Sequence, residues 1–213
     1  MKTEGRFAIG VDPGVTETGV VLSQEDARGD LIPVAWATMS CPPGDPGVAR
    51  VTALSGNVVN LIMCWIEEYQ IETVDIAIEL PILKRNPAGL ILQVRLLEEI
   101  ESGIFHIVAG ELKECWVTEV NPITSKSLAG CGRSEKPVAV SPFADYDARI
   151  ATKEALADAW AHSLATWGIA KNATRLAMHD MTSARVIVHD SKPETIQPHA
   201  WAGYGGYNLR EAL

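Results

Sequence analysis

The sequence has few of the features that mark secreted, membrane-spanning or disordered proteins. Its 213 residues include four cysteines, which are widely spaced and form neither a CxxC pair nor a zinc-binding pattern. No run approaches 18 consecutive apolar residues, so we expect no membrane-spanning helix and no membrane partner. No signal-peptide pattern precedes the first apolar segment, so we expect a cytoplasmic protein with reduced thiols and with Cys64 and Cys115 buried. A content of 47% apolar and 21% charged residues excludes a disordered polymer.

Positive charge is also scarce. The chain has 27 acidic and 18 basic residues, a net charge of −9, whereas phosphate-binding proteins are usually basic. The acidity is concentrated in residues 1–81, whose net charge is −8, while residues 82–153 are neutral. Two segments within that neutral part hold several cations and at most one acid; they are residues 82–95, with Lys84, Arg85 and Arg95, and residues 121–136, with Lys126, Arg133 and Lys136. These segments predict a locally positive surface on an acidic protein.

Hydrophobic periodicity predicts an α/β protein with one mixed sheet. Strands are predicted over residues 6–11, 19–23, 31–39, 74–78 and 116–120, and helices over 51–69, 86–113, 122–129 and 150–167. The first three strands suit an antiparallel meander, and the helices between the later strands favour parallel crossovers. We therefore expect a five-stranded mixed sheet flanked by helices in a domain of residues 1–170. Residues 171–213 are expected to form a C-terminal extension, in which 184–189 have a strand-like pattern.

Acidic residues occur where two apolar strands are predicted to end. Asp12 follows the first strand and Glu79 follows the fourth, while Glu154 and Asp158 lie one turn apart on the last long helix. Ligands gather at strand ends in open α/β sheets. Several converging carboxylates are stable in the ionised form only with a cation, and Mg²⁺ prefers such oxygen ligands. Each acid alone is also compatible with an ordinary turn residue or a solvated helix residue.

The last long helix carries a stripe of small side chains beside its predicted core face. The core face is predicted from Leu156, Trp160, Leu164 and Trp167, and the small stripe consists of Ala157, Ala161 and Ala165. Small side chains allow a helix to approach a sheet closely. Because Glu154 and Asp158 lie at the edge of this stripe, we expect the helix to bring them toward the strand ends.

Four segments, in order along the chain, resemble the motifs of RuvC-type Holliday junction resolvases. Ile9-Gly10-Val11-Asp12-Pro13-Gly14, followed by Thr18-Gly19-Val20, resembles the first motif, and Ala77-Ile78-Glu79 resembles the second. Residues 130–136 (GCGRSEK) resemble the family's glycine-rich loop with its acid and lysine, and Ala157-Asp158-Ala159-Trp160-Ala161 resembles the last motif. The first motif alone also resembles the start of sugar kinases and actin-like ATPases. Four ordered matches are more specific.

The resemblance implies an RNase H-like fold and a homodimer that resolves four-way DNA junctions by paired symmetric nicks. It implies phosphodiester hydrolysis with two Mg²⁺ ions per site, for which Mn²⁺ would substitute. Asp12, Glu79 and Asp158 match family metal ligands. The family's fourth ligand lies three residues before the last Asp, where this chain has Ala155. Glu154, one residue further back, is the substitute that helix geometry allows.

The resemblance also assigns DNA-binding residues. Lys136 matches a family lysine that contacts the phosphate near the site, and Lys126 lies at or one residue from a second family lysine. Ile82 stands where the family has an aromatic residue that wedges into the junction, and an apolar side chain can still wedge between base steps. Lys84 and Arg85 follow it within reach of phosphates, and Arg133 lies in the glycine-rich loop. The alternative for the basic residues is that they are ordinary solvated side chains, and the alternative for Ile82 is a position in the core.

The helix predicted over 86–113 has more apolar surface than one core-facing stripe needs, which favours either a dimer interface or burial within its own domain. Three other functions stay open. They are an RNase H-like nuclease for other branched DNA or RNA, a junction-binding protein without catalysis, and an actin-like ATP-binding lobe. An actin-like protein needs two lobes, for which 213 residues leave little room.

Overall fold

The computed structural model describes residues 6–42, 44, 47–82, 87–131, 137, 141–171 and 184–190. The strands are β1 (Phe7–Asp12), β2 (Glu17–Glu25), β3 (Leu31–Ser40), β4 (Thr73–Glu79), β5 (Glu114–Val120) and β6 (Ala184–Asp190). The helices are α1 (Gly47–Glu68), α2 (Pro87–Glu111), α3 (Pro122–Leu128) and α4 (Ile150–Lys171). Each predicted strand and helix is present, with ends that differ by a few residues.

The strands form one mixed sheet in the order β3-β2-β1-β4-β5-β6. Strands β1, β2 and β3 pair antiparallel as a meander, and β1, β4 and β5 pair parallel. This arrangement confirms the predicted mixed sheet. Strand β6 pairs antiparallel with β5 and adds a sixth strand at that edge. It comes from residues 171–213, so part of the C-terminal extension joins the sheet.

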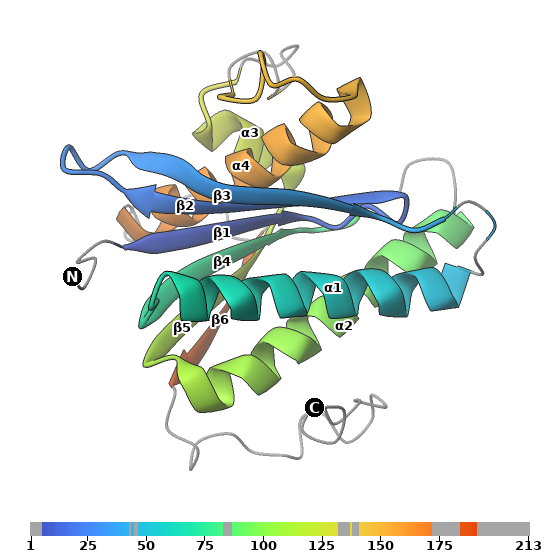
Figure 1. Ribbon diagram of the computed structural model, residues 1–213, viewed down its shortest axis with the longest axis horizontal. Coiled ribbons are helices and arrows are strands. Elements are labelled where there is room, and N and C mark those ends of the chain that lie inside the picture. Colours follow the sequence, from blue (N-terminus) through green and yellow to red (C-terminus); the bar gives the residue numbers. More distant parts are fainter. Residues whose placement is uncertain are drawn as a thin grey trace.

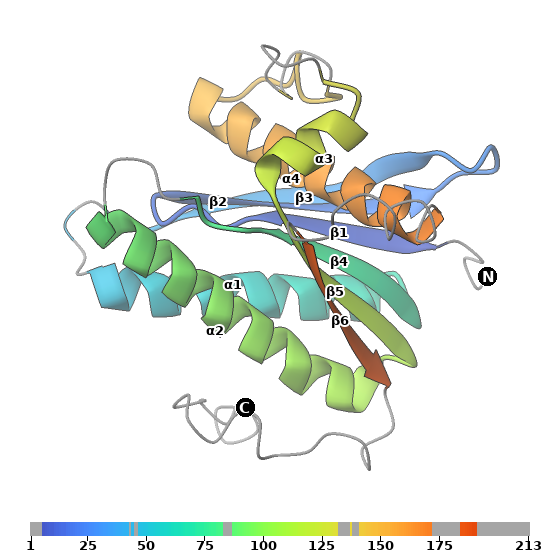
Figure 2. The same cartoon turned by 180° about the vertical axis from the view of Figure 1, so that it is seen from behind.

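Helices cover the two faces of the sheet in different ways. Helices α1 and α2 lie on one face and α3 and α4 on the other (Figures 1 and 2). Because side chains alternate along a strand, Phe7, Ile9 and Val11 of β1 point into the large apolar core under α1 and α2. Gly10 and Asp12 therefore face α4. The sequence of β1 thus places apolar residues on the core face and the smallest residue and an acid on the other.

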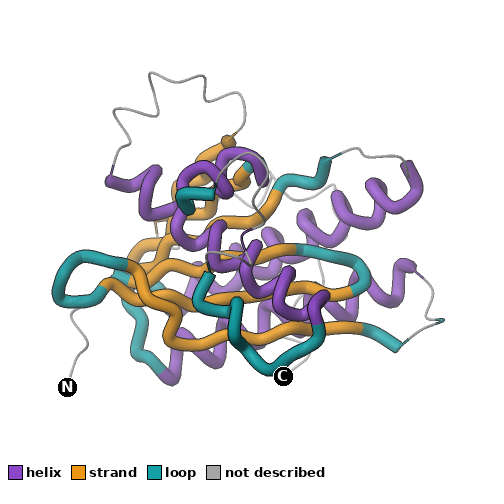
Figure 3. Tube along the Cα trace, turned by 90° about the horizontal axis from the view of Figure 1, so that it is seen from above, coloured by secondary structure: helices purple, strands orange, loops and turns teal. Residues whose placement is uncertain are grey.

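Helix α4 lies almost directly on the backbone of the sheet. A Cβ atom placed on Gly10 would be 1.8 Å from the carbonyl oxygen of Ala159, and one on Gly19 would be 2.3 Å from that of Ala155. Neither position has room for a side chain. Seen from the α4 side, the strands pass beneath the helices (Figure 3). The predicted close approach is present. Ala155 and Ala159 make it against β2 and β1, and Ala165 of the predicted stripe packs with Ala77 and Val120.

The predicted core face of α4 is partly wrong. Leu156 is buried, but Trp160 and Leu164 are only half-buried. The face against the sheet is lined by small residues, and Ser163 on it hydrogen-bonds Ser23 of β2 through the two hydroxyl groups, 2.9 Å apart. Large apolar side chains have no place between surfaces this close, so they move to the sides of the helix.

Helices α1 and α2 complete the other layer. By length and hydropathy α1 could cross a membrane, but its apolar residues Val51, Leu54, Val58 and Ile62 are fully buried in the core under the sheet. Cys64 on the same helix is exposed, which corrects the predicted burial, whereas Cys115 is buried as expected. The four cysteines are free thiols.

The contact between α4 and β1 predicts a large effect of a single methyl group. Gly10→Ala places Cβ against the Ala159 carbonyl, so the helix must move off the sheet, and we expect a loss of about 2–3 kcal/mol in the free energy of unfolding. Urea denaturation measures the change. Gly56→Ala in α1 is the matched control, because a Cβ there meets nothing within 4 Å, and it should stabilise by about 0.5–1 kcal/mol. Equal stabilities of the two variants would contradict the close contact.

Candidate metal centre

Asp12 and Glu79 lie side by side at the carboxyl ends of two parallel strands. Val11 of β1 pairs with Ile78 of β4, so the next residue of each strand brings its carboxylate to the same sheet edge. Both side chains are half-buried and belong to the face that α4 covers. Strand β1 ends there because Pro13 follows and the amide of Gly14 donates to the carbonyl of Asp12 at 3.0 Å.

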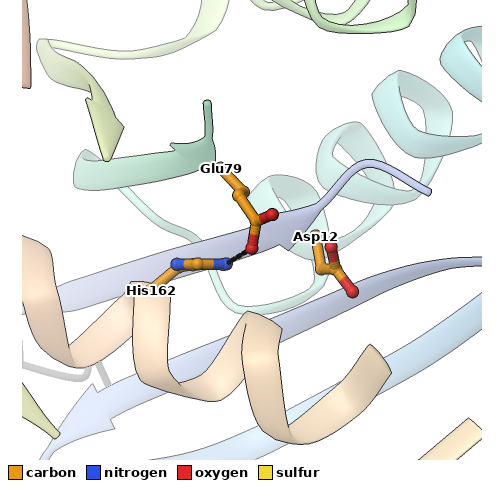
Figure 4. Close-up of side chains that lie close together, drawn as sticks. All are labelled: Asp12, Glu79 and His162. Atoms are coloured by element: carbon orange, nitrogen blue, oxygen red, sulfur yellow. Dashed lines mark hydrogen bonds and ion pairs between the residues drawn. The ribbon is translucent and has the colours of Figure 1, made fainter. Parts of the chain in front are cut away.

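A histidine of α4 joins the two carboxylates. Nε2 of His162 lies 3.0 Å from Oε2 of Glu79, and the imidazole is fully buried. One ligand atom from each of Asp12, Glu79 and His162 lies within 4.8 Å of the others. Figure 4 shows the three side chains converging from β1, β4 and α4.

Sequence reasoning did not include His162. The signal available was its spacing, because Glu154, Asp158 and His162 follow one another every four residues and so share one stripe of α4. The prediction took only the two acids of that stripe, Glu154 and Asp158. Whether the stripe faces β4 or solvent is decided by how the helix is turned on the sheet, and a single sequence does not reveal that rotation.

Asp158 lies one turn before His162 and is partly buried. Burial is the largest influence on this carboxyl group and raises its pKa. The positive charge of Lys126 and the neighbouring His162 lower the pKa, while the negative charges of Glu79 and Glu154 raise it. The net shift is upward, so the folded protein disfavours the charged form of Asp158. These influences place Asp158 beside the three-residue cluster, among like charges that a cation would relieve.

Lys126 approaches Asp158 from α3. Asn121 caps this helix, its side-chain oxygen accepting from the amide of Ile123, and Pro122 occupies the first helical turn. Lys126 then falls in the last turn, where its Nζ lies 3.7 Å from Oδ1 of Asp158. The predicted DNA-contacting lysine is therefore held at the edge of the carboxylate cluster.

The other predicted residues divide into two groups. Glu154 is half-buried one turn before Asp158, but its carboxylate is not a member of the cluster that Asp12 forms. Ile82 follows β4 and is 36% exposed, so it is a surface residue and not a core residue. Lys84, Arg85, Arg133 and Lys136 lie outside the described residues.

The donor set suits a hard divalent cation. Carboxylate oxygens are the ligands that Mg²⁺ and Mn²⁺ prefer, and imidazole nitrogen is accepted by Mn²⁺ and by softer metals. Asp12 and Glu79 converge on one point with His162. The carboxylate of Asp158 is not part of that group, but it is near enough to Glu79 for the negative charge of Glu79 to raise its pKa. The residues present therefore fit the metal that the sequence motifs imply.

Comparison with known proteins supports the fold. The sequence matches no protein-family model and no curated protein. Among solved structures, Thermus thermophilus RuvC bound to a Holliday junction substrate superposes with a TM-score of 0.59 at 16% identity, covering 85% of this chain and 99% of that one. A second structure of Thermus thermophilus RuvC gives 0.58 at 20% identity with the same coverage. The yeast mitochondrial Holliday junction resolvase Ydc2 gives 0.54 at 10% identity, covering 80% of this chain and 83% of that one.

These similarities confirm the predicted fold class. The mixed sheet, its meander and its parallel strands are those of RuvC and Ydc2, and the match extends over most of the described chain. At sequence identities of 10–20%, the comparison supports the fold and nothing further.

The raised pKa of Asp158 predicts that removing its charge stabilises the metal-free protein. Above the folded pKa, ionised Asp158 costs more in the folded state than in the unfolded state, so Asp158→Asn should be the more stable protein near pH 7. The difference should shrink as the pH falls through the folded pKa, where wild-type Asp158 also becomes neutral. Asp75, whose pKa burial also raises, is present in both proteins and cancels.

Chemical denaturation in the presence of a chelator, at about pH 7 and about pH 4, measures this difference. The exposed Asp145→Asn serves as the control and should leave stability unchanged at both values. A variant at position 158 that is less stable than wild type near neutral pH would contradict the predicted sign.

Proposed function

We propose that this protein is a metal-dependent endonuclease that resolves four-way DNA junctions. The observation that carries the proposal is the convergence of Asp12 and Glu79 at the ends of adjacent parallel strands, with Asp158 beside them. The chain's likeness to a RuvC structure solved with a Holliday junction supports junction DNA as the substrate. The reaction is hydrolysis in which water attacks the phosphorus and the bond to the 3′-oxygen breaks, leaving a 5′-phosphate and a 3′-hydroxyl.

The carboxylates have distinct tasks in this reaction. When bound, two Mg²⁺ or Mn²⁺ ions would supply an activated water and stabilise the leaving oxygen. Asp12, central at the end of β1, would be shared by both ions. Glu79 and Asp158 would each help to hold one of them, and Glu154 is the candidate for a further carboxylate. Lys126, whose Nζ lies 3.7 Å from Oδ1 of Asp158, would contact the phosphate once a cation binds Asp158.

The DNA is expected on the surface where these residues emerge. Ile82 is exposed directly beyond β4, three residues after Glu79, and Lys126 lies beside Asp158. Residues 82–95 and 121–136, the locally positive segments, both begin at the carboxyl ends of strands. Because the protein as a whole is acidic, we expect modest affinity for plain duplex DNA and strong dependence on salt. Recognition would then depend on the shape of the junction, and Lys84, Arg85, Arg133 and Lys136 remain candidate phosphate contacts.

A homodimer would supply the two active sites that paired nicks require. Helix α2 lies on the outside of the layer opposite α4 (Figure 2). On this helix Ile91 is 68% exposed and Val94 is 38% exposed, which is apolar surface that the described part of the chain leaves uncovered. The proposed symmetric cleavage needs a second copy of the chain, and we expect that copy to pack against this exposed part of α2. The cytoplasmic location predicted from the sequence is compatible with these roles.

Asp12→Asn tests the metal centre. The substitution keeps the shape of the side chain but removes the charge at the bridging position, so we expect junction cleavage to fall by at least about a thousandfold while junction binding persists. Gel assays with a synthetic four-way junction, with Mg²⁺, with Mn²⁺ and with chelator, measure both properties. Asp75→Asn, which changes a buried carboxylate at the opposite end of β4, is the control and should cleave normally.

The same assay separates the alternative functions. Paired nicks at symmetric positions support a resolvase. Cleavage only of forks, flaps or RNA-containing substrates would indicate a different nuclease of this fold. Binding without cleavage in either metal would indicate an inactive junction binder, and ATP turnover without DNA cleavage would contradict the nuclease altogether.

Ile91→Glu tests the dimer. A charged side chain at the centre of the exposed α2 surface should convert the dimer to a monomer, which size-exclusion chromatography with light scattering detects. Paired nicking should fall with it. Ile150→Glu on α4 is the matched control, because Ile150 is 75% exposed and lies on another helix. Loss of the dimer in both variants, or in neither, would argue against α2 as the interface.

A further inference from the structure

We propose that His162 is a positioning residue, which holds the carboxylate of Glu79 toward Asp12 by a hydrogen bond from Nε2 and does not itself bind the cation. The inference rests on the proposed metal centre. It concerns the one member of the cluster that is not an acid, and it decides whether the centre is built from oxygen alone or from oxygen and nitrogen.

The hydrogen bond assigns the proton on the ring. Nε2 of His162 lies 3.0 Å from Oε2 of Glu79. A carboxylate that binds a metal accepts hydrogen bonds and has none to donate, so Nε2 is the donor in the arrangement that we propose. A nitrogen that carries a hydrogen has no lone pair to offer a metal, so binding through Nε2 would require this hydrogen to leave.

The other ring nitrogen is a poor place for that hydrogen. Nδ1 of His162 is buried, and within the described part of the chain it has no hydrogen-bond partner. Histidines that bind metals almost always donate their second N–H to a carbonyl or carboxylate. Moving the hydrogen to Nδ1 would leave a buried N–H donor without an acceptor, which is rarer and more costly than a buried lone pair without a donor. The surroundings of the ring thus favour donation to Glu79.

The helix keeps the ring in this place. His162 has no exposed surface and is flanked by the two contacts that fix α4 on the sheet, Gly10 against Ala159 and Ser23 with Ser163. A ring held so firmly limits the rotation of the Glu79 side chain. The cation would then meet the carboxylates of Asp12, Glu79 and Asp158, an all-oxygen set that suits Mg²⁺ and Mn²⁺ better than Zn²⁺.

Nuclear magnetic resonance of the metal-free protein tests the proton assignment. In protein labelled with ¹⁵N at histidine, the signals of His162, identified by their loss in His162→Gln, should show hydrogen on Nε2. Saturating Mg²⁺ should shift the His162 signals and leave the hydrogen on Nε2. Hydrogen on Nδ1 alone, or its transfer there on addition of metal, would overturn the proposal.

Binding of Mn²⁺, followed by electron paramagnetic resonance, tests the positioning role with three variants. The side-chain amide nitrogen of Gln lies as many bonds from Cα as Nε2 of His, so His162→Gln keeps a donor to Glu79. His162→Asn, whose amide reaches only the position of Nδ1, and His162→Ala do not. We expect His162→Ala and His162→Asn to bind Mn²⁺ about 10- to 100-fold more weakly than wild type. His162→Gln should retain most of the wild-type affinity. Thr166→Ala, which removes a buried hydroxyl one turn after His162, is the matched control and should bind as wild type does.

Two results of these Mn²⁺ measurements would overturn the inference. One is a Gln variant that binds Mn²⁺ as weakly as the Ala variant. The other is a pulsed resonance signal from directly bound imidazole nitrogen in wild type that disappears in His162→Gln. Failure of the proposed function looks different: the expected tautomer and the expected order of Mn²⁺ affinities, without cleavage of any junction, would support the role of His162 and overturn the nuclease.

Discussion

The close packing of α4 on β1 and β2 is the constraint on which the rest of this molecule depends. Gly10 and Gly19 offer bare backbone, and the carbonyls of Ala159 and Ala155 fill the space where side chains would be. A helix held this near the sheet carries Asp158 and His162 down to the level of the strand ends, where Asp12 and Glu79 emerge. Were the helix at an ordinary distance, with large apolar residues between it and the strands, its polar residues would stand too far from the two strand carboxylates to share a cation with them.

One face of the sheet carries the main apolar core, and the other face carries the candidate metal centre. The face under α1 and α2 is a continuous apolar core, built from alternate residues of β1, β2, β4 and β5. The face under α4 has only small apolar clusters, such as that of Val21, Phe143 and Leu156, and it contains buried hydroxyls and the carboxylate cluster. Burial raises the pKa of Asp158, so the metal-free site opposes folding. The large core on the other face can offset that cost.

The acidity of the whole chain and its proposed nucleic-acid partner are compatible for the same geometric reason. The excess of acids is concentrated in residues 1–81, and two of those acids, Asp12 and Glu79, belong to the cluster where cations would offset them. Lys126 shows the complementary arrangement, because α3 places it against Asp158 and so at the edge of the same site. The net charge of the whole chain is therefore a poorer guide to the binding partner than the charges close to the proposed site.

The sequence by itself determined the order of strands and helices, the α/β class, and the places of Asp12 and Glu79. Alternation and helical spacing are local patterns, and Pro13 and Pro81 lie one and two residues beyond the ends of β1 and β4. Ordered motifs also pointed to Asp158. Only the tertiary structure decided which face of α4 meets the sheet, and hence that Ala155, Ala159 and Ser163 line the contact and that His162 reaches Glu79. The pairing of β6 with β5 was likewise decided there. The rotation of a helix and the partner of an edge strand depend on contacts between residues far apart in the chain, which no local pattern encodes.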